Sequence, residues 1–158
     1  MSSPFTYTAQ LKSAFITRNY VTEHVTCIGI YQLSLITECR SYQVINDATR
    51  RQGYILPSGQ SYRCDSGLAT RWYRFLGASI QMPTSCVPTH RCGTHAPGWL
   101  QGPRPSSGQI RNVKVCFHWS GNCCRWSTYI RVRNCGAFYV YELKRPPACH
   151  LRYCGNWG

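Results

Sequence analysis

The sequence predicts a small, disulfide-rich α+β domain that is dominated by β-strands, with short helices and long irregular loops. Cysteine content is the first reason: the 158 residues include 11 cysteines, and the ten from Cys39 to Cys154 could close five disulfides. The second reason is the alternation of apolar and polar residues in the second half of the chain, which is typical of strands. The third is that no segment keeps a helical period over several turns, so any helices should be short.

Cysteine positions and charge place the start of the domain near residue 39. Cys27 is the only cysteine before it, and residues 1–38 carry no net charge, so the whole +13 falls in the residues that follow. We therefore expect an N-terminal segment of residues 1–38, a ten-cysteine domain of residues 39–154 and a tail of residues 155–158. Cys27 is left for an intermolecular disulfide, a free thiol or no role at all.

The cysteines also indicate an oxidising compartment, and hence a secreted or extracellular location. An apolar stretch that begins at Val25 has the length of a signal-peptide core, but it follows Glu23 and lacks a clean cleavage pattern. No run of 18 apolar residues occurs, so no membrane span is expected. No asparagine is followed by x-Ser or x-Thr, so the chain has no acceptor for an N-linked glycan.

The first half of the domain should be irregular. Residues 41–61 are polar and contain several turn-forming residues, so we expect turns there. Residues 82–108 hold five prolines, and neither a regular helix nor a central strand should run through them. This stretch should be a long irregular segment that Cys86 and Cys92 tie down covalently.

Strands are expected in the second half. Residues 113–118 alternate Val, Val and Phe with Lys, Cys and His, and residues 130–133 alternate Ile and Val with Arg. Residues 137–143 form an apolar, aromatic run that suits a strand covered on both faces. Two prolines at residues 146 and 147 should end it.

Positive charge is the main clue to a ligand, because 18 Lys and Arg stand against 5 Asp and Glu. Most of the basic residues are Arg, which stacks on aromatic rings and binds carboxylate, sulfate or phosphate groups through two hydrogen bonds. A module that binds glycans or extracellular proteins, anionic ones included, would use such side chains, and Arg74, Trp99 and Arg104 are the candidate contacts. The alternative is a solvated basic face with no dedicated ligand, since the arginines are dispersed.

Metal and nucleic-acid sites have weaker support. Two cysteines and two histidines lie close together, but their spacing does not match the ligand pairs of zinc sites, and disulfides account for the cysteines better; these residues are Cys86, His90, Cys92 and His95. Residues 71–75 interleave Arg with aromatic residues, as in platforms for nucleic-acid bases. Such residues serve more often as core and cation–π partners in cysteine-rich domains, so we expect no metal, no cofactor and no nucleic acid.

Catalysis has little support as well. His118 with Cys123 or Cys124 could act as base and nucleophile only if the thiol were free. The domain contains few carboxylates, Asp47, Asp65 and Glu142, and none is close to another in sequence. We therefore expect that the protein is not an enzyme.

Several motifs resemble a known family. They include MPTSCVP at residues 82–88, HWSGNCC at residues 118–124 and PPACHLRYC at residues 146–154. The double cysteine after His-Trp and the closing Cys-His-Leu-x-Tyr-Cys are specific signatures. Residues 39–154 thus resemble the uromodulin-type ten-cysteine domain, and all ten domain cysteines occur in the family's order.

The resemblance implies a disulfide pairing that the spacing of the cysteines leaves open. Cys27 has no counterpart in the family and remains unpaired. The implied pairs are Cys39–Cys135, Cys64–Cys149, Cys86–Cys123, Cys92–Cys154 and Cys116–Cys124.

The resemblance also implies a function. Family members are secreted or surface-anchored glycoproteins, and in some the domain presents a mannose-rich glycan to bacterial adhesins. The asparagine that carries this glycan would align with Gln101, and Pro103 replaces the hydroxyl residue, so we do not expect a glycan decoy. The expected function is an extracellular, non-enzymatic recognition or adhesion module. The alternative is a purely structural domain or a fragment of a larger extracellular glycoprotein.

Overall fold

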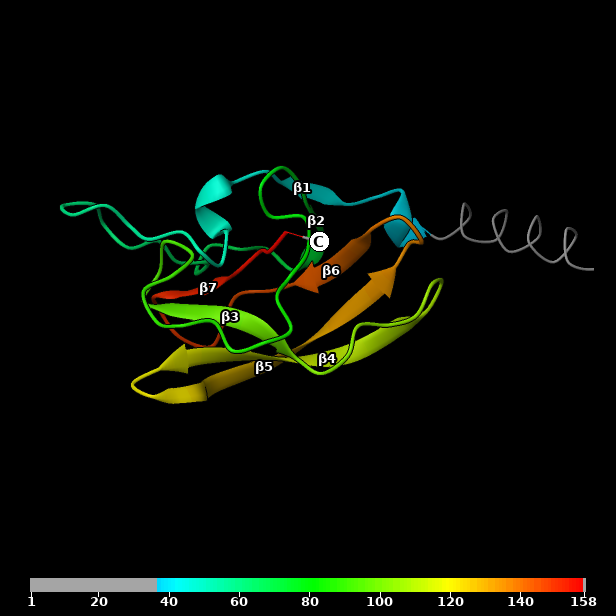
Figure 1. Cartoon of the computed structure of the whole chain (residues 1–158). Coiled ribbons are helices and arrows are strands. Elements are labelled where there is room, and N and C mark those ends of the chain that lie inside the picture. Colours follow the sequence, from blue (N-terminus) through cyan, green and yellow to red (C-terminus); the bar gives the residue numbers. More distant parts are fainter. Residues whose placement is uncertain (1–36, 158) are drawn as a thin grey trace, which may run out of the picture. The chain divides into compact units, whose positions relative to one another are not determined.

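The computed structural model describes residues 37–157, and these residues contain a seven-stranded sheet (Figure 1). The strand order is β1-β2-β6-β5-β4-β3-β7. The inner strands pair antiparallel, whereas β1 and β7 each add to an edge as a parallel strand. The strands are β1 Gln43–Ile45, β2 Arg71–Phe75, β3 Ala96–Gln101, β4 Ile110–Trp119, β5 Asn122–Asn134, β6 Tyr139–Leu143 and β7 Leu151–Tyr153.

The β4–β5 hairpin is the longest pair of strands and forms the centre of the sheet (Figure 1). Its two-residue turn consists of Ser120 with φ 49° and Gly121 with φ 74°. Positive φ at both positions is the geometry of a type I′ turn, which matches the right-handed twist of the flanking strands. The strands predicted over residues 113–118, 130–133 and 137–143 are confirmed, as β4, β5 and β6.

The main core lies on one face of this sheet. Val113 pairs with Ile130 and Phe117 pairs with Trp126 across the hairpin, so their side chains share a face. Aromatic and aliphatic residues of the other strands complete the cluster; they include Phe75, Tyr141, Leu143, Leu151 and Tyr153. Alternation along β4 and β5 therefore places the main core on one face and the remaining residues of these strands on the opposite face.

Helical content is lower than predicted. Within residues 37–157 the helices are two short 3₁₀ turns, η1 Thr37–Cys39 and η2 Ala48–Arg50. The fold is thus β-dominated, and the α+β class is not confirmed. The reason is that the connections between strands are rich in proline and glycine, and none offers an apolar face of the length that a packed helix needs.

The proline-rich segment was expected to contain no central strand, and this expectation is wrong. β3 contains Pro97 and lies between β4 and β7. Pairing of β3 with β4 begins only at Gly98, which is paired with Phe117. On the β7 side the neighbour Ala96 donates its backbone N–H to His150 O. Pro97 therefore lies at a position where pairing with β4 and β7 requires no backbone N–H donor, so the strand tolerates the proline.

Four disulfides join distant parts of the fold: Cys39–Cys135, Cys86–Cys123, Cys92–Cys154 and Cys116–Cys124. Three of these pairs have Cα atoms 5.7 Å apart, and the fourth 4.5 Å. These are four of the pairs that the resemblance implies. The fifth, between Cys64 and Cys149, is not formed in the structure, where both residues are exposed thiols, so a count of five disulfides is not confirmed.

A second, smaller core surrounds these sulfurs. Trp99 of β3 and Cys116 of β4 are paired positions, and both alternate with residues of the main core. They therefore lie on the opposite face of the sheet, where Val87 and the Cys92–Cys154 disulfide pack against them. Disulfides and one indole thus cover a face that would otherwise be open to water.

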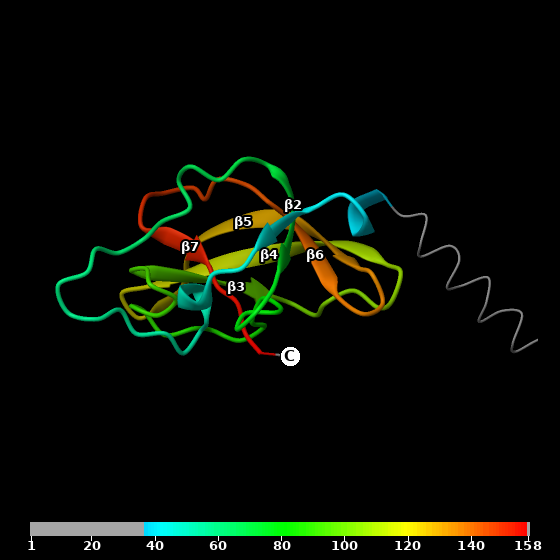
Figure 2. The ribbon, with the colours of Figure 1, turned by 90° about the horizontal axis from the view of Figure 1, so that it is seen from above.

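The long connection between η2 and β2, residues 51–70, extends beyond the sheet (Figure 2). Isolated bridges attach its base, such as that between Arg51 and Gly155. Gly155 and Asn156, which were expected in a tail, are thus tied to the domain, the latter by a bridge with Gln81. In the part of the chain that the structure describes, no helix is long and apolar enough to cross a membrane.

Candidate functional site

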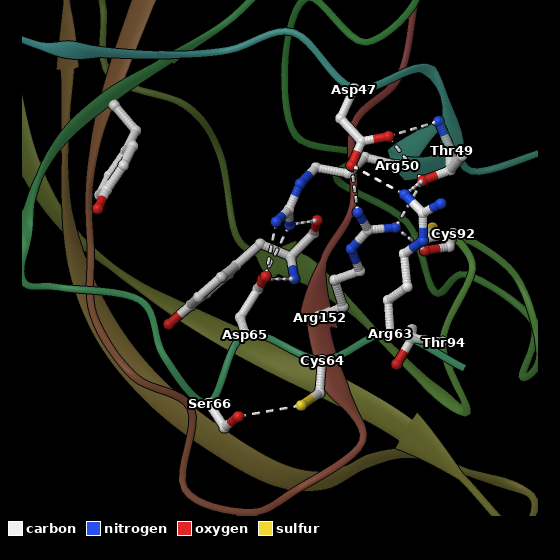
Figure 3. Close-up of polar contacts among 12 residues, drawn as sticks. Asp47, Thr49, Arg50, Arg63, Cys64, Asp65, Ser66, Cys92, Thr94 and Arg152 are labelled. Carbon is white, nitrogen blue, oxygen red and sulfur yellow. Dashed lines mark hydrogen bonds and ion pairs between the residues drawn. The ribbon is translucent and has the colours of Figure 1, made fainter. Parts of the chain in front are cut away.

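A buried ion pair joins the long connection to the sheet. Both amino groups of Arg50 donate to the carboxylate of Asp65, at 2.6 and 2.8 Å, and the two side chains are only 10% and 3% exposed (Figure 3). The backbone N–H of Tyr153 also donates to Asp65, at 2.9 Å, and Arg50 donates to Tyr153 O. The carboxylate therefore has three donors, and such extra hydrogen bonds are the condition for a buried ion pair to be tolerated.

A second arginine, Arg152 of β7, lies beside Arg50 (Figure 3). Arg152 pairs with Asp47 and donates to Thr49 Oγ1 and to Cys92 O, both at 2.9 Å. Burial, followed by the charge of Arg50, lowers the pKa of Arg152 to about 10, so its guanidinium stays charged at neutral pH. These contacts hold η2, β7 and the Cys92–Cys154 disulfide together, and we assign them a structural role.

The Asp47 carboxylate makes stability depend on pH. Burial raises the pKa of Asp47, but hydrogen bonds from Thr49 and the charge of Arg152 outweigh it and hold the pKa below its ordinary value. The resulting stabilisation is present above the unfolded-state pKa of about 4 and is lost as pH falls through the lower folded-state value.

We predict that Asp47→Asn lowers the free energy of unfolding by about 1–3 kcal/mol at neutral pH, because Arg152 loses a charged acceptor. The difference from the wild type should shrink at about pH 2, where a larger fraction of Asp47 is protonated than at neutral pH. Urea denaturation at both pH values measures this. An equal difference at the two pH values would contradict the assignment.

Cys64 lies at the edge of this network, next to Asp65 (Figure 3). Hydrogen bonds from the side chain and backbone of Ser66, and a further one from the backbone of His150, lower the pKa of the Cys64 thiol. The backbone N–H of Asp65 donates to Leu151 O at 2.9 Å, which holds the part of the loop with Cys64 beside the segment that carries Cys149. The two exposed thiols therefore belong to neighbouring segments.

The three candidate ligand contacts do not form a common surface. Trp99 is only 9% exposed and donates its indole N–H to Cys123 O, so its side chain fills the second core and is not available as a ligand contact. Arg104 donates to Met82 O at 2.5 Å and lies over the Tyr139 ring, which fixes a loop to the core. Arg74 packs over Phe138 at 3.8 Å from the ring centroid and donates to Tyr42. Internal contacts thus occupy all three side chains.

A basic groove lies instead at the end of β3 and across the outer face of the hairpin. It has a volume of about 280 Å³, and its lining includes Gln101, Arg111, Lys114 and Tyr129. Lys114 pairs with both Gln101 and Tyr129 in the sheet, so the three side chains stand side by side on one face. We define these four residues as the basic groove.

Two features suit the basic groove to ligand contact. The Tyr129 side chain is 61% exposed, which places a large aromatic face in water. The positive charge of Arg111 and Lys114 is uncompensated, because every carboxylate in residues 37–157 already pairs with another arginine; these acids are Glu38, Asp47, Asp65 and Glu142. An acidic ring-shaped ligand would match both features.

Sequence reasoning missed this groove although one signal was present. Tyr129 stands in phase with Arg131 and Arg133 along β5, and out of phase with the buried Ile130 and Val132. An aromatic residue in the polar phase of a strand faces outward. What the sequence did not reveal is that Gln101 and Lys114 would be its neighbours, since this depends on the pairing of β3 with β4.

The disulfides remove the sulfur ligands of the zinc and thiol sites that were considered from the sequence. Cys86 is bonded to Cys123 and Cys92 is bonded to Cys154, so neither can supply a thiolate. Cys124 is bonded to Cys116, and His118 instead contacts Val87 O through Nδ1 at 2.8 Å. Both sites would therefore need a sulfur that is already bonded to another cysteine.

Comparison with known proteins gives the family. Residues 73–155 match the model of the uromodulin-like domain family. Uromodulin of Mus musculus is 46% identical over 119 residues, which cover 73% of this chain and 18% of that protein. Pancreatic secretory granule membrane major glycoprotein GP2 of Homo sapiens is 42% identical over 119 residues, with 73% of this chain and 21% of that protein covered. The chain spans about a fifth of the length of these relatives, and it belongs to the uromodulin-like domain family.

Proposed function

We propose that this chain is an extracellular, non-enzymatic recognition module that binds acidic glycans through its basic groove. The observation that supports this most directly is the exposed Tyr129 ring in a groove whose cations, Arg111 and Lys114, pair with no carboxylate of residues 37–157. An aromatic face packs on the apolar face of a sugar ring, while Lys and Arg bind a carboxylate or sulfate substituent. Membership in a family of glycoprotein domains supports an extracellular location.

The position of the groove adds to this proposal. By the resemblance, Gln101 occupies the place where some family members carry a glycan-bearing asparagine. This chain has no N-linked acceptor there, and Gln101 instead lines the groove. The same end of β3 would thus receive a glycan from a partner rather than present one.

A purely structural role is the second candidate. The relatives are about five times longer than the matched region, so a domain of this kind is one part of a larger glycoprotein there. A sheet with four disulfides and a buried charge network suits a rigid spacer between other modules. This role predicts no saturable glycan binding by the isolated chain.

We also propose that Cys64 and Cys149 close a fifth disulfide in the secreted protein. Support comes from the family resemblance and from the hydrogen bond between Asp65 N and Leu151 O, which keeps the two segments adjacent. Both thiols are exposed, so an oxidant can reach them.

The double substitution Arg111→Glu and Lys114→Glu should weaken binding to immobilised heparin, a sulfated polysaccharide, by more than about tenfold. Two attractive charges become repulsive in the groove, and the fold is unaffected because both side chains lie outside the cores. Surface plasmon resonance at physiological salt measures the change. Tyr129→Ala should weaken binding several-fold through lost ring contact.

The matched control is Lys144→Glu with Arg145→Glu, in the β6–β7 connection. It changes the net charge by the same amount, and neither residue lines the groove. If this variant weakens binding as strongly, the interaction depends on overall charge and the groove is not the site. If the wild type shows no saturable binding to heparin, the structural role is preferred.

A further inference from the structure

Three of the protein's five histidines meet in one cluster. The ring centres of His95 and His150 are 4.8 Å apart, and those of His90 and His95 are 5.7 Å apart. These residues come from positions up to 60 apart in the sequence and have no part in the basic groove. Two of them, His90 and His95, belonged to the zinc site considered from the sequence, but His150 did not.

Backbone hydrogen bonds hold the three histidines together. His95 and His150 each precede a strand by one residue, and the parallel pairing of Ala96 with Leu151 places them side by side. The ring spacing of 4.8 Å equals the usual spacing of neighbouring strands, about 4.8 Å. His90 donates its backbone N–H to His95 O at 3.0 Å, and Ala96 N–H donates to His150 O at 3.1 Å. The cluster is therefore built on the sheet edge and on one turn beside it.

Aromatic side chains enclose the cluster on two sides. Tyr62 of the long connection packs on His95 with ring centres 3.7 Å apart. Trp119 presents its ring edge-on to His90 and His95, at 5.4 and 5.8 Å. A pocket of about 420 Å³ opens beside them and is lined by His95, His150, Trp119 and Trp126. The Nδ1 atom of His95 is buried and has no hydrogen-bond partner, which leaves a costly unsatisfied nitrogen.

We propose that His90, His95 and His150 bind a borderline-soft divalent cation of the Zn²⁺ type. Two imidazoles that share a tetrahedral zinc ion have ring centres about 5 Å apart, because each nitrogen lies about 2 Å from the metal. The His90–His95 and His95–His150 spacings bracket this distance, whereas His90 and His150 are not themselves among the ring contacts of the described residues. Imidazole is a preferred ligand for Zn²⁺ and Cu²⁺, and three such ligands leave a fourth position for water.

Side-chain rotation completes the site. Among residues 37–157, the group whose ligand atoms all lie within 4.8 Å of one another is Cys86, His118 and Cys123, in which the two sulfurs are bonded together. The three clustered imidazoles thus bind one ion only after their nitrogens turn inward. His90 and His150 are exposed, while Tyr62 packs on His95.

Charge sets the affinity. The net charge of +13 repels a cation, and the neighbouring carboxylate, Asp65, is already paired with Arg50. Neutral imidazoles alone must therefore hold the ion, and we expect micromolar rather than tighter binding. Added salt should leave the affinity unchanged or increase it, because it screens the repulsion. This is opposite to the salt dependence expected for the basic groove.

The test is a titration of the full chain, produced in an oxidising host, with Zn²⁺ alone. Calorimetry should show one ion per chain, and NMR of the imidazole rings should show shifts for His90, His95 and His150 but not for His118. His150→Asn should weaken binding by more than about tenfold, since even the loss of a residue that only supports a metal ligand costs 10–100-fold. Asn suits position 150 because φ there is 60°.

The matched control is His118→Asn, which should leave the affinity unchanged. Absence of saturable binding at millimolar Zn²⁺, or equal affinity in both variants, would overturn the proposal. Alkylation of free thiols before the titration distinguishes binding by the histidines from binding by the Cys64 and Cys149 thiols. If alkylation abolishes binding, and the Co²⁺ complex of the untreated chain shows sulfur-to-metal absorption, Cys64 and Cys149 are the ligands and the three-histidine site is wrong. The NMR readout on the wild-type chain keeps the test valid even if a variant fails to fold.

Discussion

Asp65→Ala should lower the free energy of unfolding by about 3–5 kcal/mol, which is the cost of leaving a buried charge without its partner. Arg50 would lose both of its carboxylate contacts, and the N–H of Tyr153 would lose its acceptor next to the chain's last disulfide. Urea denaturation of the disulfide-intact protein, followed by circular dichroism, measures the change. It is the largest effect that we expect from a single substitution outside the cores and disulfides.

The control is Glu142→Ala, which breaks the ion pair with Arg131. These side chains are 25% and 48% exposed, so water screens the pair and the expected loss is below about 1 kcal/mol. A double variant, Arg50→Met with Asp65→Leu, should recover much of the stability lost in Asp65→Ala, because no charge is then buried alone. Equal losses in Asp65→Ala and Glu142→Ala would show that the buried Arg50–Asp65 pair contributes no more to the free energy of unfolding than the exposed pair.

Removal of the Cys92–Cys154 disulfide by Cys92→Ala and Cys154→Ala should lower the free energy of unfolding by about 2–5 kcal/mol. The bond closes a loop of 62 residues, and its sulfurs belong to the second core, so both chain entropy and packing are affected. Thermal unfolding monitored by calorimetry, with intact mass under alkylation to count the remaining bonds, tests this. A loss of less than about 1 kcal/mol would mean that the charge network of Arg152 alone holds this region.

The comparison variant is Cys64→Ser with Cys149→Ser. Both residues are exposed and outside the cores, so their removal affects only the unfolded chain and costs less than removal of Cys92–Cys154. The intact mass of the alkylated wild type shows directly whether Cys64 and Cys149 are free thiols or a disulfide. A shift by two alkyl groups at Cys64 and Cys149, in protein from an oxidising host, would contradict the fifth disulfide that we propose.

Local pattern was enough to predict the strands of the hairpin and β6. Alternation in residues 113–118 and 130–133 depends only on which face of a strand is buried, and the apolar type of every second residue identifies that face. β7 was not predicted, because all three of its residues are buried and show no alternation. β2 was not predicted because its residues are all Arg or aromatic, so the burial that alternates along the strand has no matching apolar and polar alternation in the sequence. β3 was not expected because residues 82–108 hold five prolines, and the tolerance of the strand for Pro97 depends on where pairing with β4 begins.

The candidate ligand contacts also show the difference between what the sequence predicts and what the packing decides. Trp99 and Arg104 have the residue types of ligand contacts, yet one fills a core and the other anchors a loop. Residue type predicts what a side chain can do, whereas the packing around it decides whether the side chain is free to do it. Tyr129 is free because it faces outward from a central strand and stays exposed to water.

The sequence by itself determined the family, the basic character of the domain and the cysteines that stabilise it, because motifs, charge and cysteine content do not depend on folding. Only the tertiary structure decided which side chains stand together. The basic groove needs the register of β3, β4 and β5, and the histidine cluster needs the parallel pairing of β3 with β7. Pairing of this kind joins residues far apart in the chain, so its energy comes from contacts that no local pattern encodes.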